Sequence, residues 1–401
     1  MFFESSSKFK QNRDNLLLEI SVRVADLGIE PISFFTFELP YLPLNNMNFR
    51  SRWTKIIEWE HWPAYMFYAP LLPYALYECI KARHLCFFYS ANPGIYHSGS
   101  GIESKHETLK IVPEHFRPRA LLVPKNTELE TIRQELIRMD LEFPLIAKPD
   151  IGFRGYLVKK LESETDLKTY LKKFNEVTFI LQEYIQRKKE CGIFYSRIPG
   201  ESKGRITSVT EKKFLKVYGD GTSTLEALIL RDERAFLYYD ILKRLHPYKF
   251  DQVLENGLEF QLTVIGNHSK GTQFMNGNHM ISEELVQAFD EFCSQMPGFY
   301  YGRLDIKYDE LEDLIAVKNF KVLEVNGIIA EPGHMYDATV RGTNYFKAVG
   351  IQKQHWKILS QIARANHRVN GVKYHPFSAF LKDIVWLRSY TQKIKKLNKI
   401  L

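Results

Sequence analysis

An apolar segment ends in a lysine, and a short loop with two glycines follows at once. The lysine is Lys148, and the loop contains Gly152, Arg154 and Gly155. Glycine lets backbone N–H groups approach phosphate oxygens, while lysine and arginine supply positive charge. The segment therefore suits contact with a phosphate, but alone it is described better as a glycine hairpin beside a surface lysine. It is not a Walker loop, because the chain contains no GxxxxGK[ST] sequence.

Two later segments place charged residues within strand-like alternation. Arg303 and Asp305 are two residues apart, and so are Glu324 and Asn326. Residues at this spacing share one face of a β-strand. If the two strands are neighbours, an arginine, two carboxylates and an amide meet on one surface, where oxygen ligands suit Mg²⁺. Two alternating strands with one solvated face are the alternative.

The order of these motifs resembles the ATP-grasp superfamily. Between the glycine loop and the two late motifs stands Gln182-Glu183-Tyr184-Ile185. The late motifs are most similar to those of D-alanine–D-alanine ligases, in which a Pro-Gly-Met turn follows. Pro332-Gly333-His334-Met335 matches that turn imperfectly, because residues 327–331 are inserted before it. Residues 219–226 also resemble a segment of cyanophycin synthetase and glutathione ligases. The resemblance covers roughly residues 100–345.

The resemblance implies a role for each matching residue. Lys148 would contact ATP phosphates, and Arg303 would stabilise charge on an acyl-phosphate or tetrahedral intermediate. Backbone groups of Glu183 and Ile185 would hold adenine, and Glu190 would bind the ribose. The implied ATP-binding residues are Lys105, Lys148, Gly152, Arg154, Gly155, Glu183, Ile185 and Glu190. The implied ligands of Mg²⁺, or of Mn²⁺ in its place, are Asp305, Glu324 and Asn326.

The activity that the resemblance implies is an ATP- and Mg²⁺-dependent ligase that joins a small-molecule carboxylate to an amine or thiol. The carboxylate would attack the γ-phosphate of ATP, and the amine would then displace phosphate from the acyl phosphate. This chemistry needs no nucleophilic side chain, and the sequence shows no convincing Ser/His/Asp or Cys/His arrangement. A small-molecule kinase and a membrane-associated protein that binds nucleotide without catalysis are the alternatives.

The elements that must position these residues indicate an α+β fold with short connections. The resemblance implies two α+β subdomains that clasp ATP, over 118–190 and 191–350, preceded by an aromatic-rich α/β region over 1–117 and followed by a helical segment over 351–401. The predicted strands are 86–89, 120–123, 143–149, 157–160 and 179–185, with further strands in 191–217. The predicted helices are 15–27, 129–139, 162–174, 225–245 and 285–296.

Three segments carry less specific signals. Prolines should break 62–76 into short pieces. The aromatic residues of 53–77 suit a helical core, or alternatively an interfacial surface. In 264–272, Asn267, Ser269 and Lys270 would bind a carboxylate or phosphate unless the segment is a plain hairpin.

Composition and charge narrow the partners. The chain has 401 residues, of which 45% are hydrophobic and 14% aromatic, so it is not a disordered protein. Of the net charge of +8, residues 377–401 carry +5 from six Lys/Arg and one Asp, so no basic stripe for nucleic acid runs through the body. This basic amphipathic segment suits a membrane surface, or alternatively a helix docked on the body. Without a signal peptide or spanning segment, we expect a cytoplasmic protein, with possible contact at the inner membrane surface.

Overall fold

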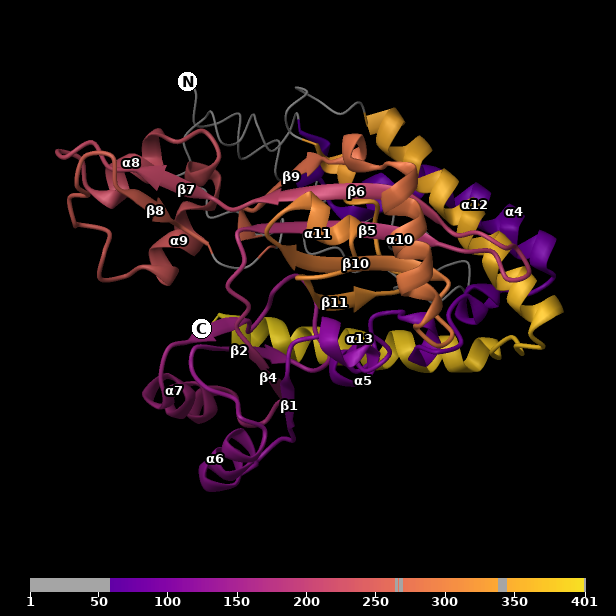
Figure 1. The fold of residues 1–401 in the computed structure, drawn as a ribbon, viewed down its shortest axis with the longest axis horizontal. Helices are drawn as coiled ribbons and strands as arrows, with labels where there is room; N and C mark the ends of the chain where they lie inside the picture. Colours follow the sequence, from indigo (N-terminus) through magenta and orange to yellow (C-terminus); the bar gives the residue numbers. More distant parts are fainter. Residues whose placement is uncertain (1–57, 264–265, 267–269, 338–344, 400–401) are drawn as a thin grey trace, which may run out of the picture. The chain divides into compact units, whose positions relative to one another are not determined.

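The computed structural model of the protein (Figure 1) describes residues 58–263, 266, 270–337 and 345–399, which belong to one of the two units into which the chain divides. Several expectations lie outside the described residues. These are the helix at 15–27, the aromatic residue Trp53, and Asn267 and Ser269 of the polar loop.

A four-stranded antiparallel sheet carries the glycine loop. Its order is β1–β4–β2–β3, and helices α6 and α7 supply much of its apolar core. The strands are β1 (Ala120–Val123), β2 (Leu145–Pro149), β3 (Lys159–Leu161) and β4 (Phe179–Glu183), and the helices are α6 (Leu129–Arg138) and α7 (Glu164–Phe174). The predicted strand at 157–160 begins two residues late. Leu157 has a positive φ of 57°, and its N–H bonds to Asn398 instead of a strand.

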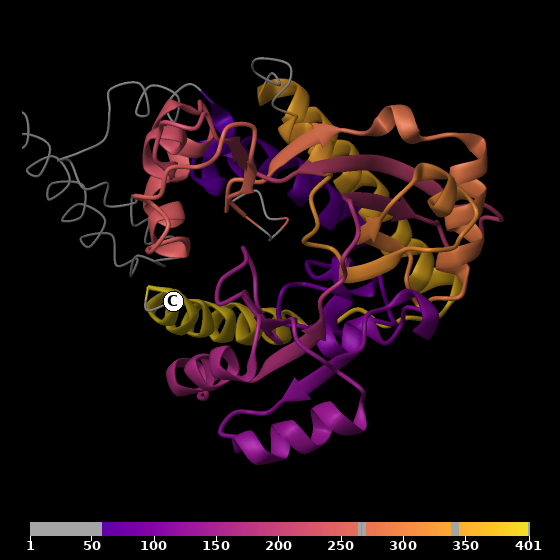
Figure 2. The same ribbon diagram turned by 60° about the vertical axis from the view of Figure 1, so that its left-hand side comes forward.

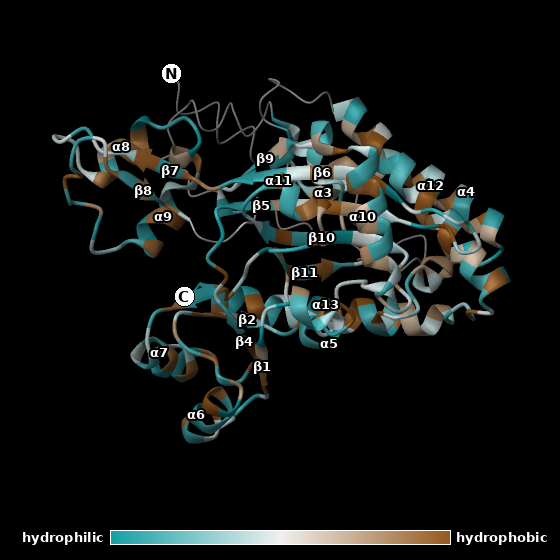
Figure 3. Ribbon diagram, viewed as in Figure 1, coloured by the Kyte–Doolittle hydropathy of each residue, from teal (hydrophilic) through white to brown (hydrophobic). Residues whose placement is uncertain are grey.

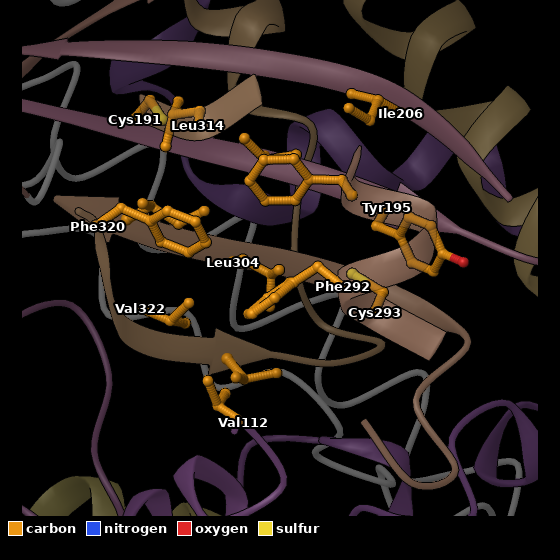
Figure 4. Close-up of a cluster of buried hydrophobic side chains, with 14 of the residues drawn as sticks. Val112, Cys191, Tyr195, Ile206, Phe292, Cys293, Leu304, Leu314, Phe320 and Val322 are labelled. Atoms are coloured by element: carbon orange, nitrogen blue, oxygen red, sulfur yellow. The ribbon is translucent and has the colours of Figure 1, made fainter. Parts of the chain in front are cut away.

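A five-stranded antiparallel sheet carries the two late motifs, in the order β11–β10–β5–β6–β9. Its strands are β5 (Lys189–Ser196), β6 (Arg205–Lys213), β9 (Gln273–Asn276), β10 (Tyr301–Tyr308) and β11 (Lys321–Asn326). On one face, α10 (Glu283–Ser294) and α11 (Leu311–Ile315) pack with Leu304, Phe320 and Val322 into an apolar cluster (Figure 4). On the other face, Phe194 and Tyr301 pack against α12 (Tyr345–Val369).

A small two-stranded sheet forms a third group of elements. Strands β7 (Lys216–Tyr218) and β8 (Glu259–Gln261) share a core with α8 (Leu225–Arg231) and α9 (Tyr239–Leu245). The segment at 219–226, which carries the resemblance to other ligases, forms a tight turn between β7 and α8 and the first residues of α8. The Asp220 carboxylate accepts hydrogen bonds from the backbone N–H groups of Thr222 and Ser223, which holds the turn before α8.

The prediction of short segments around 62–76 is confirmed, with breaks at the prolines. Helix α3 (Ala64–Tyr68), the 3₁₀ turn η2 (Ala69–Leu71) and α4 (Leu72–Ala82) follow one another. The strand predicted at 86–89 is wrong, because Phe87–Ser90 form a 3₁₀ turn, η3, closed by hydrogen bonds such as Ala91 N–H to Phe88 O. The described part of the N-terminal region, 58–117, contains only helices and turns, where we expected an α/β layer.

Helix α13 (Phe377–Asn398) occupies the basic C-terminal segment, and its C-terminal part lies beside the four-stranded sheet (Figures 1 and 2). Ile394 is fully buried in the core of that sheet, and the Tyr390 hydroxyl donates to Ile151 O at 2.7 Å. Apolar and polar residues are interspersed along the helix (Figure 3). Among the helices of the described ranges, none has the length and apolarity that crossing a membrane requires.

Candidate functional site

Strands β10 and β11 are neighbours in the sheet, so the condition under which the two late motifs would meet is fulfilled. In their antiparallel register Asp305 lies opposite Glu324, and Arg303 lies opposite Asn326. Leu304, which stands between Arg303 and Asp305, faces the apolar cluster. Because side chains alternate along a strand, Arg303 and Asp305 point to the opposite face. The expected meeting of an arginine, two carboxylates and an amide is confirmed.

Asp305 is the centre of a dense charge cluster. Its carboxylate accepts from Arg303 Nε at 2.9 Å and from Asn326 Nδ2 at 3.2 Å, and Lys212 Nζ lies 3.2 Å from it. Burial alone would raise the pKa of Asp305, but the positive charges of Arg303 and Lys212 outweigh it and lower the pKa. Asp305 therefore stays ionised at neutral pH.

Glu324 lies between two lysines that come from different parts of the chain. Lys105, at the start of α5 (Lys105–Leu109), forms an ion pair with the Glu324 carboxylate. Lys148, at the end of β2, donates to Leu323 O at 3.4 Å, and Gln182 Nε2 donates to the same oxygen at 3.3 Å. The four-stranded sheet therefore contacts β11 at the candidate site.

The two lysines differ in their ionisation. Burial lowers the pKa of Lys148 to about 8, because the attraction of Glu324 only partly offsets burial and the positive charge of Lys105 acts in the same direction as burial. For Lys105 burial also lowers the pKa, but Glu324 and the other nearby carboxylates more than offset it, so its pKa is raised. Lys105 remains charged, whereas Lys148 titrates near neutrality.

Lys212 is a site residue that the sequence analysis missed. It lies on β6, its side chain is only 3% exposed, and its Nζ bridges Glu190 at 2.8 Å and Asp305 at 3.2 Å. The sequence shows only a lysine within a region of expected strands, and its burial becomes visible in the structure. Glu190, implied as the ribose-binding residue, is itself buried in this ion pair, and its role toward ribose stays a prediction.

Gly192 is a second residue that the sequence analysis missed. It lies opposite Asp305 on β5, and a Cβ atom there would come within 2.9 Å of Arg303 Cδ. Any larger residue would push the arginine away from the carboxylate it contacts.

The expected adenine-binding segment lies at the end of β4. The Glu183 backbone N–H donates to Arg119 O at 2.9 Å, and the carboxylate of Glu183 accepts from the Arg119 N–H at 3.1 Å. Ile185 O accepts from Lys307 Nζ at 3.2 Å. The buried Lys307 therefore lies beside this segment. The contact of Glu183 and Ile185 with adenine stays a prediction.

The glycine loop is tied to the helix that carries Lys105. Just before the loop, the Asp150 carboxylate accepts from Ser104 Oγ at 2.8 Å and from the His106 N–H at 3.0 Å. Within the loop Arg154 and Gly155 both have a positive φ, of 54° and 65°. Glycine adopts this conformation without strain, which allows the turn at Gly155. The loop and Lys105 are thus held as one unit, with Gly152 at its start.

The inserted residues after β11 connect the site to the aromatic segment. Arg303 Nη1 donates to Glu331 O at 3.2 Å, while the Glu331 carboxylate accepts from the hydroxyls of Tyr336, at 2.7 Å, and Tyr68. Trp59 stacks on Tyr336 with ring centroids 5.0 Å apart and is 7% exposed. The described part of the aromatic segment therefore forms a core behind the site, which favours the core interpretation over the interfacial one.

The donor set fits the preferences of Mg²⁺. Asp305, Glu324 and Asn326 offer two carboxylates and an amide from neighbouring strands, and Mg²⁺ usually takes one or two carboxylates and completes its shell with phosphate and water. Within the described residues no group of three or more His, Cys, Asp or Glu side chains that could hold a metal occurs. A site with so few protein ligands would depend on a bound phosphate.

Solved structures of ATP-grasp ligases, mainly D-alanine–D-alanine ligases, match this chain at low identity. The bifunctional glutathione synthetase from Pasteurella multocida is 15% identical with a TM-score of 0.32, and the match covers 63% of this chain and 36% of that one. The D-alanine–D-alanine ligase from Bacillus anthracis is 16% identical with a TM-score of 0.36, and the match covers 69% of this chain and 71% of that one. The VanG D-Ala:D-Ser ligase from Enterococcus faecalis is 15% identical with a TM-score of 0.38, and the match covers 67% of this chain and 64% of that one.

These are the same groups that the sequence motifs resemble. The TM-scores of these three matches lie between 0.32 and 0.38, and the function proposed below rests on the residues of the site. No family model and no curated protein matches the chain.

Proposed function

We propose that this protein is an ATP- and Mg²⁺-dependent ligase that joins a carboxylate to an amine through an acyl phosphate. The observation that carries the proposal is the convergence of Lys105 and Arg303 on the pair of carboxylates at β10 and β11, with Lys148 on the adjacent Leu323 O. Positive side chains around two ionised carboxylates suit the transfer of a phosphoryl group, in which catalysis is mostly positioning and charge stabilisation.

Each side chain has a distinct part in the proposed reaction. Lys148 and Lys105 neutralise phosphate oxygens of ATP while the substrate carboxylate attacks the γ-phosphorus and ADP leaves. Arg303, fixed against Asp305 by two hydrogen bonds, faces the charge that develops on the acyl group when the amine attacks. Phosphate then leaves with the electron pair of the broken C–O bond. No covalent bond to the protein forms.

Asp305, Glu324 and Asn326 would hold Mg²⁺, which supplies charge neutralisation to the phosphates when bound. Lys212 positions Asp305 by contacting its carboxylate and that of Glu190. Residues 118–190 and 191–350 would be the two subdomains around ATP. Glu183, Ile185 and Glu190 would contact the nucleoside, and the loop of Gly152, Arg154 and Gly155 would cover the phosphates.

Trapping the acyl phosphate with hydroxylamine tests the proposal. The full chain is incubated with ATP, Mg²⁺ and a panel of carboxylates, and hydroxamate and phosphate are measured. Hydroxamate that depends on ATP and on one class of acid supports the ligase. A stable phosphorylated product without hydroxamate identifies the kinase alternative. Failure of ATP with Mg²⁺ to raise the melting temperature, together with no product, refutes both enzymes, because a ligand at 100 times its Kd should add about 2.7 kcal/mol.

A further inference from the structure

A cavity of about 330 Å³ lies beside the turn that follows β11. Helix α13 contributes Phe380, Asp383, Ile384 and Leu387 to its wall, a spacing that places all four on one face of the helix. Helices α4 and α12 and the turn η3 supply most of the remaining wall. The volume falls in the range of small-molecule sites.

Two segments lead directly from this cavity to the candidate site. Ile328 lines the cavity two residues after Asn326, and Ile102 lines it three residues before Lys105. A chain spans at most about 3.6 Å per residue. The Cα atoms of Asn326 and Ile328 therefore lie within about 7 Å of each other, and those of Ile102 and Lys105 within about 11 Å. The segments are also joined, since the Ile328 N–H donates to Ser98 O at 3.0 Å. The cavity therefore adjoins the proposed site of acyl transfer.

The wall of the cavity is apolar and acidic. Among the described residues that line it there is no lysine, arginine or histidine, and the charged side chains are those of Glu78 and Asp383. Glu78 is 2% exposed and accepts from the hydroxyls of Tyr74, at 2.7 Å, and Ser360, at 2.5 Å. The cation nearest to it among the ion pairs is Lys81 at 3.9 Å. Asp383 is paired with His97 Nδ1 at 2.6 Å, and Glu78 with two hydroxyls, so the described wall offers an anionic group no cationic side chain to pair with.

We propose that this cavity binds the apolar body of the amine substrate. The inference rests on the proposed ligase function and specifies one of its two substrates. An aryl or branched alkyl group of that amine would move out of water and pack against Phe87, Leu359 and Ile384. This transfer is favourable in proportion to the apolar area buried. The acidic wall favours a cationic molecule, whereas the substrate carboxylate must lie among the lysines and Arg303.

Three probes with one body and different head groups test the assignment. Binding of 4-phenylbutylamine, 4-phenylbutanol and 4-phenylbutyrate to the full chain is measured by calorimetry at pH 7. The amine should bind at least tenfold more tightly than the carboxylate, with the alcohol between them. Equal affinities, a preference for the carboxylate, or no saturable binding of any probe would overturn the proposal.

The substitution Ala75→Trp locates the binding. Ala75 lines the cavity from α4 and is half-buried, so tryptophan fills the space, whereas its neighbour Leu76 is 60% exposed and is absent from the wall. We expect Ala75→Trp to weaken binding of the amine at least tenfold and Leu76→Trp to leave it unchanged. Ile329→Lys, at a lining residue that is 53% exposed, adds a positive charge and should have the same effect if Ala75→Trp does not fold. Wild-type affinity in the folded variants contradicts the assignment.

The outcome is separable from that of the proposed function. Probe binding needs no ATP, and hydroxamate formation needs no amine substrate. Probe binding without any hydroxamate would refute the ligase, whereas hydroxamate formation without probe binding would refute only the assignment of the cavity.

Discussion

Binding of ATP should weaken as the pH rises from 7 to 9, because Lys148 loses its proton in that interval. Burial lowers the pKa of this lysine to about 8, and a neutral amine no longer attracts phosphate. Because a lysine is charged below its pKa, the favourable contribution is present at pH 7 and is lost as the pH passes through 8.

The magnitude follows from the charged fraction. With a pKa near 8, about 90% of Lys148 is charged at pH 7 and about 10% at pH 9. If ATP binds only the charged form, its apparent Kd rises about tenfold over this interval, which corresponds to about 1.4 kcal/mol.

Calorimetric titration with ATP in the presence of EDTA measures this effect. EDTA removes divalent metal ions, so the electrostatic environment of Lys148 is that of the metal-free site. Lys148→Arg should abolish the pH dependence, since arginine stays charged throughout. Lys105→Arg is the matched control and should retain the dependence, because the pKa of Lys105 is raised and this lysine is already charged at both values. A flat profile in the wild type, or a tenfold fall that persists in Lys148→Arg, would refute the assignment of Lys148.

Three further perturbations follow from the same structure. Glu324→Gln should reduce hydroxamate formation at least 100-fold, whereas Glu310→Gln, in an exposed ion pair with Lys189, should leave it unchanged; equal activity of the two variants contradicts the metal assignment. Lys212→Met should destabilise the protein by about 3–5 kcal/mol in urea, because Glu190 loses its buried ion-pair partner while Asp305 keeps Arg303; the exposed Lys213→Met is the control, and equal losses would count against the buried bridge. Neutralising three exposed lysines in the last turn of α13 and just after it should weaken binding to anionic vesicles about 100-fold, at about 1 kcal/mol each, and unchanged sedimentation with vesicles would remove the membrane hypothesis. The three are Lys395, Lys396 and Lys399.

The shared face of the polar residues within each of β10 and β11 could be predicted from the sequence because that information is local, whereas their pairing entered only as a condition. Alternation around Arg303 and Asp305, and around Glu324 and Asn326, fixes which side chains share a face once the strands are neighbours. The same reasoning fails for the segment at 86–89. Four consecutive apolar or aromatic residues have no period, so a short buried turn and a short buried strand look alike.

Lys212 and Gly192 could not be predicted because their importance depends on strand order. Lys212 reaches Asp305 only because β5 lies between β6 and β10 in the sheet, and nothing in the sequence around it specifies that arrangement. The contact between Lys148 and β11 is of the same kind, since it joins two sheets through residues 175 positions apart. The residue types of a site can thus be read locally, whereas the partners that set their charge come from long-range packing.

The cationic side chains of the site differ in how well their charge is satisfied. Lys105, Lys212 and Arg303 contact the carboxylates of Glu190, Asp305 and Glu324, whereas Lys148 contacts Leu323 O. Three of the cations are each within an ion pair, and Lys148 is the one whose pKa is lowered, because burial outweighs the attraction of Glu324 and its hydrogen bond goes to a neutral carbonyl. Burying a charge without a partner is costly, so an anion placed beside Lys148 would relieve the cost and raise its pKa. The residue with the least satisfied charge is therefore the one that faces the proposed phosphates, which is what a site built to bind a polyanion requires.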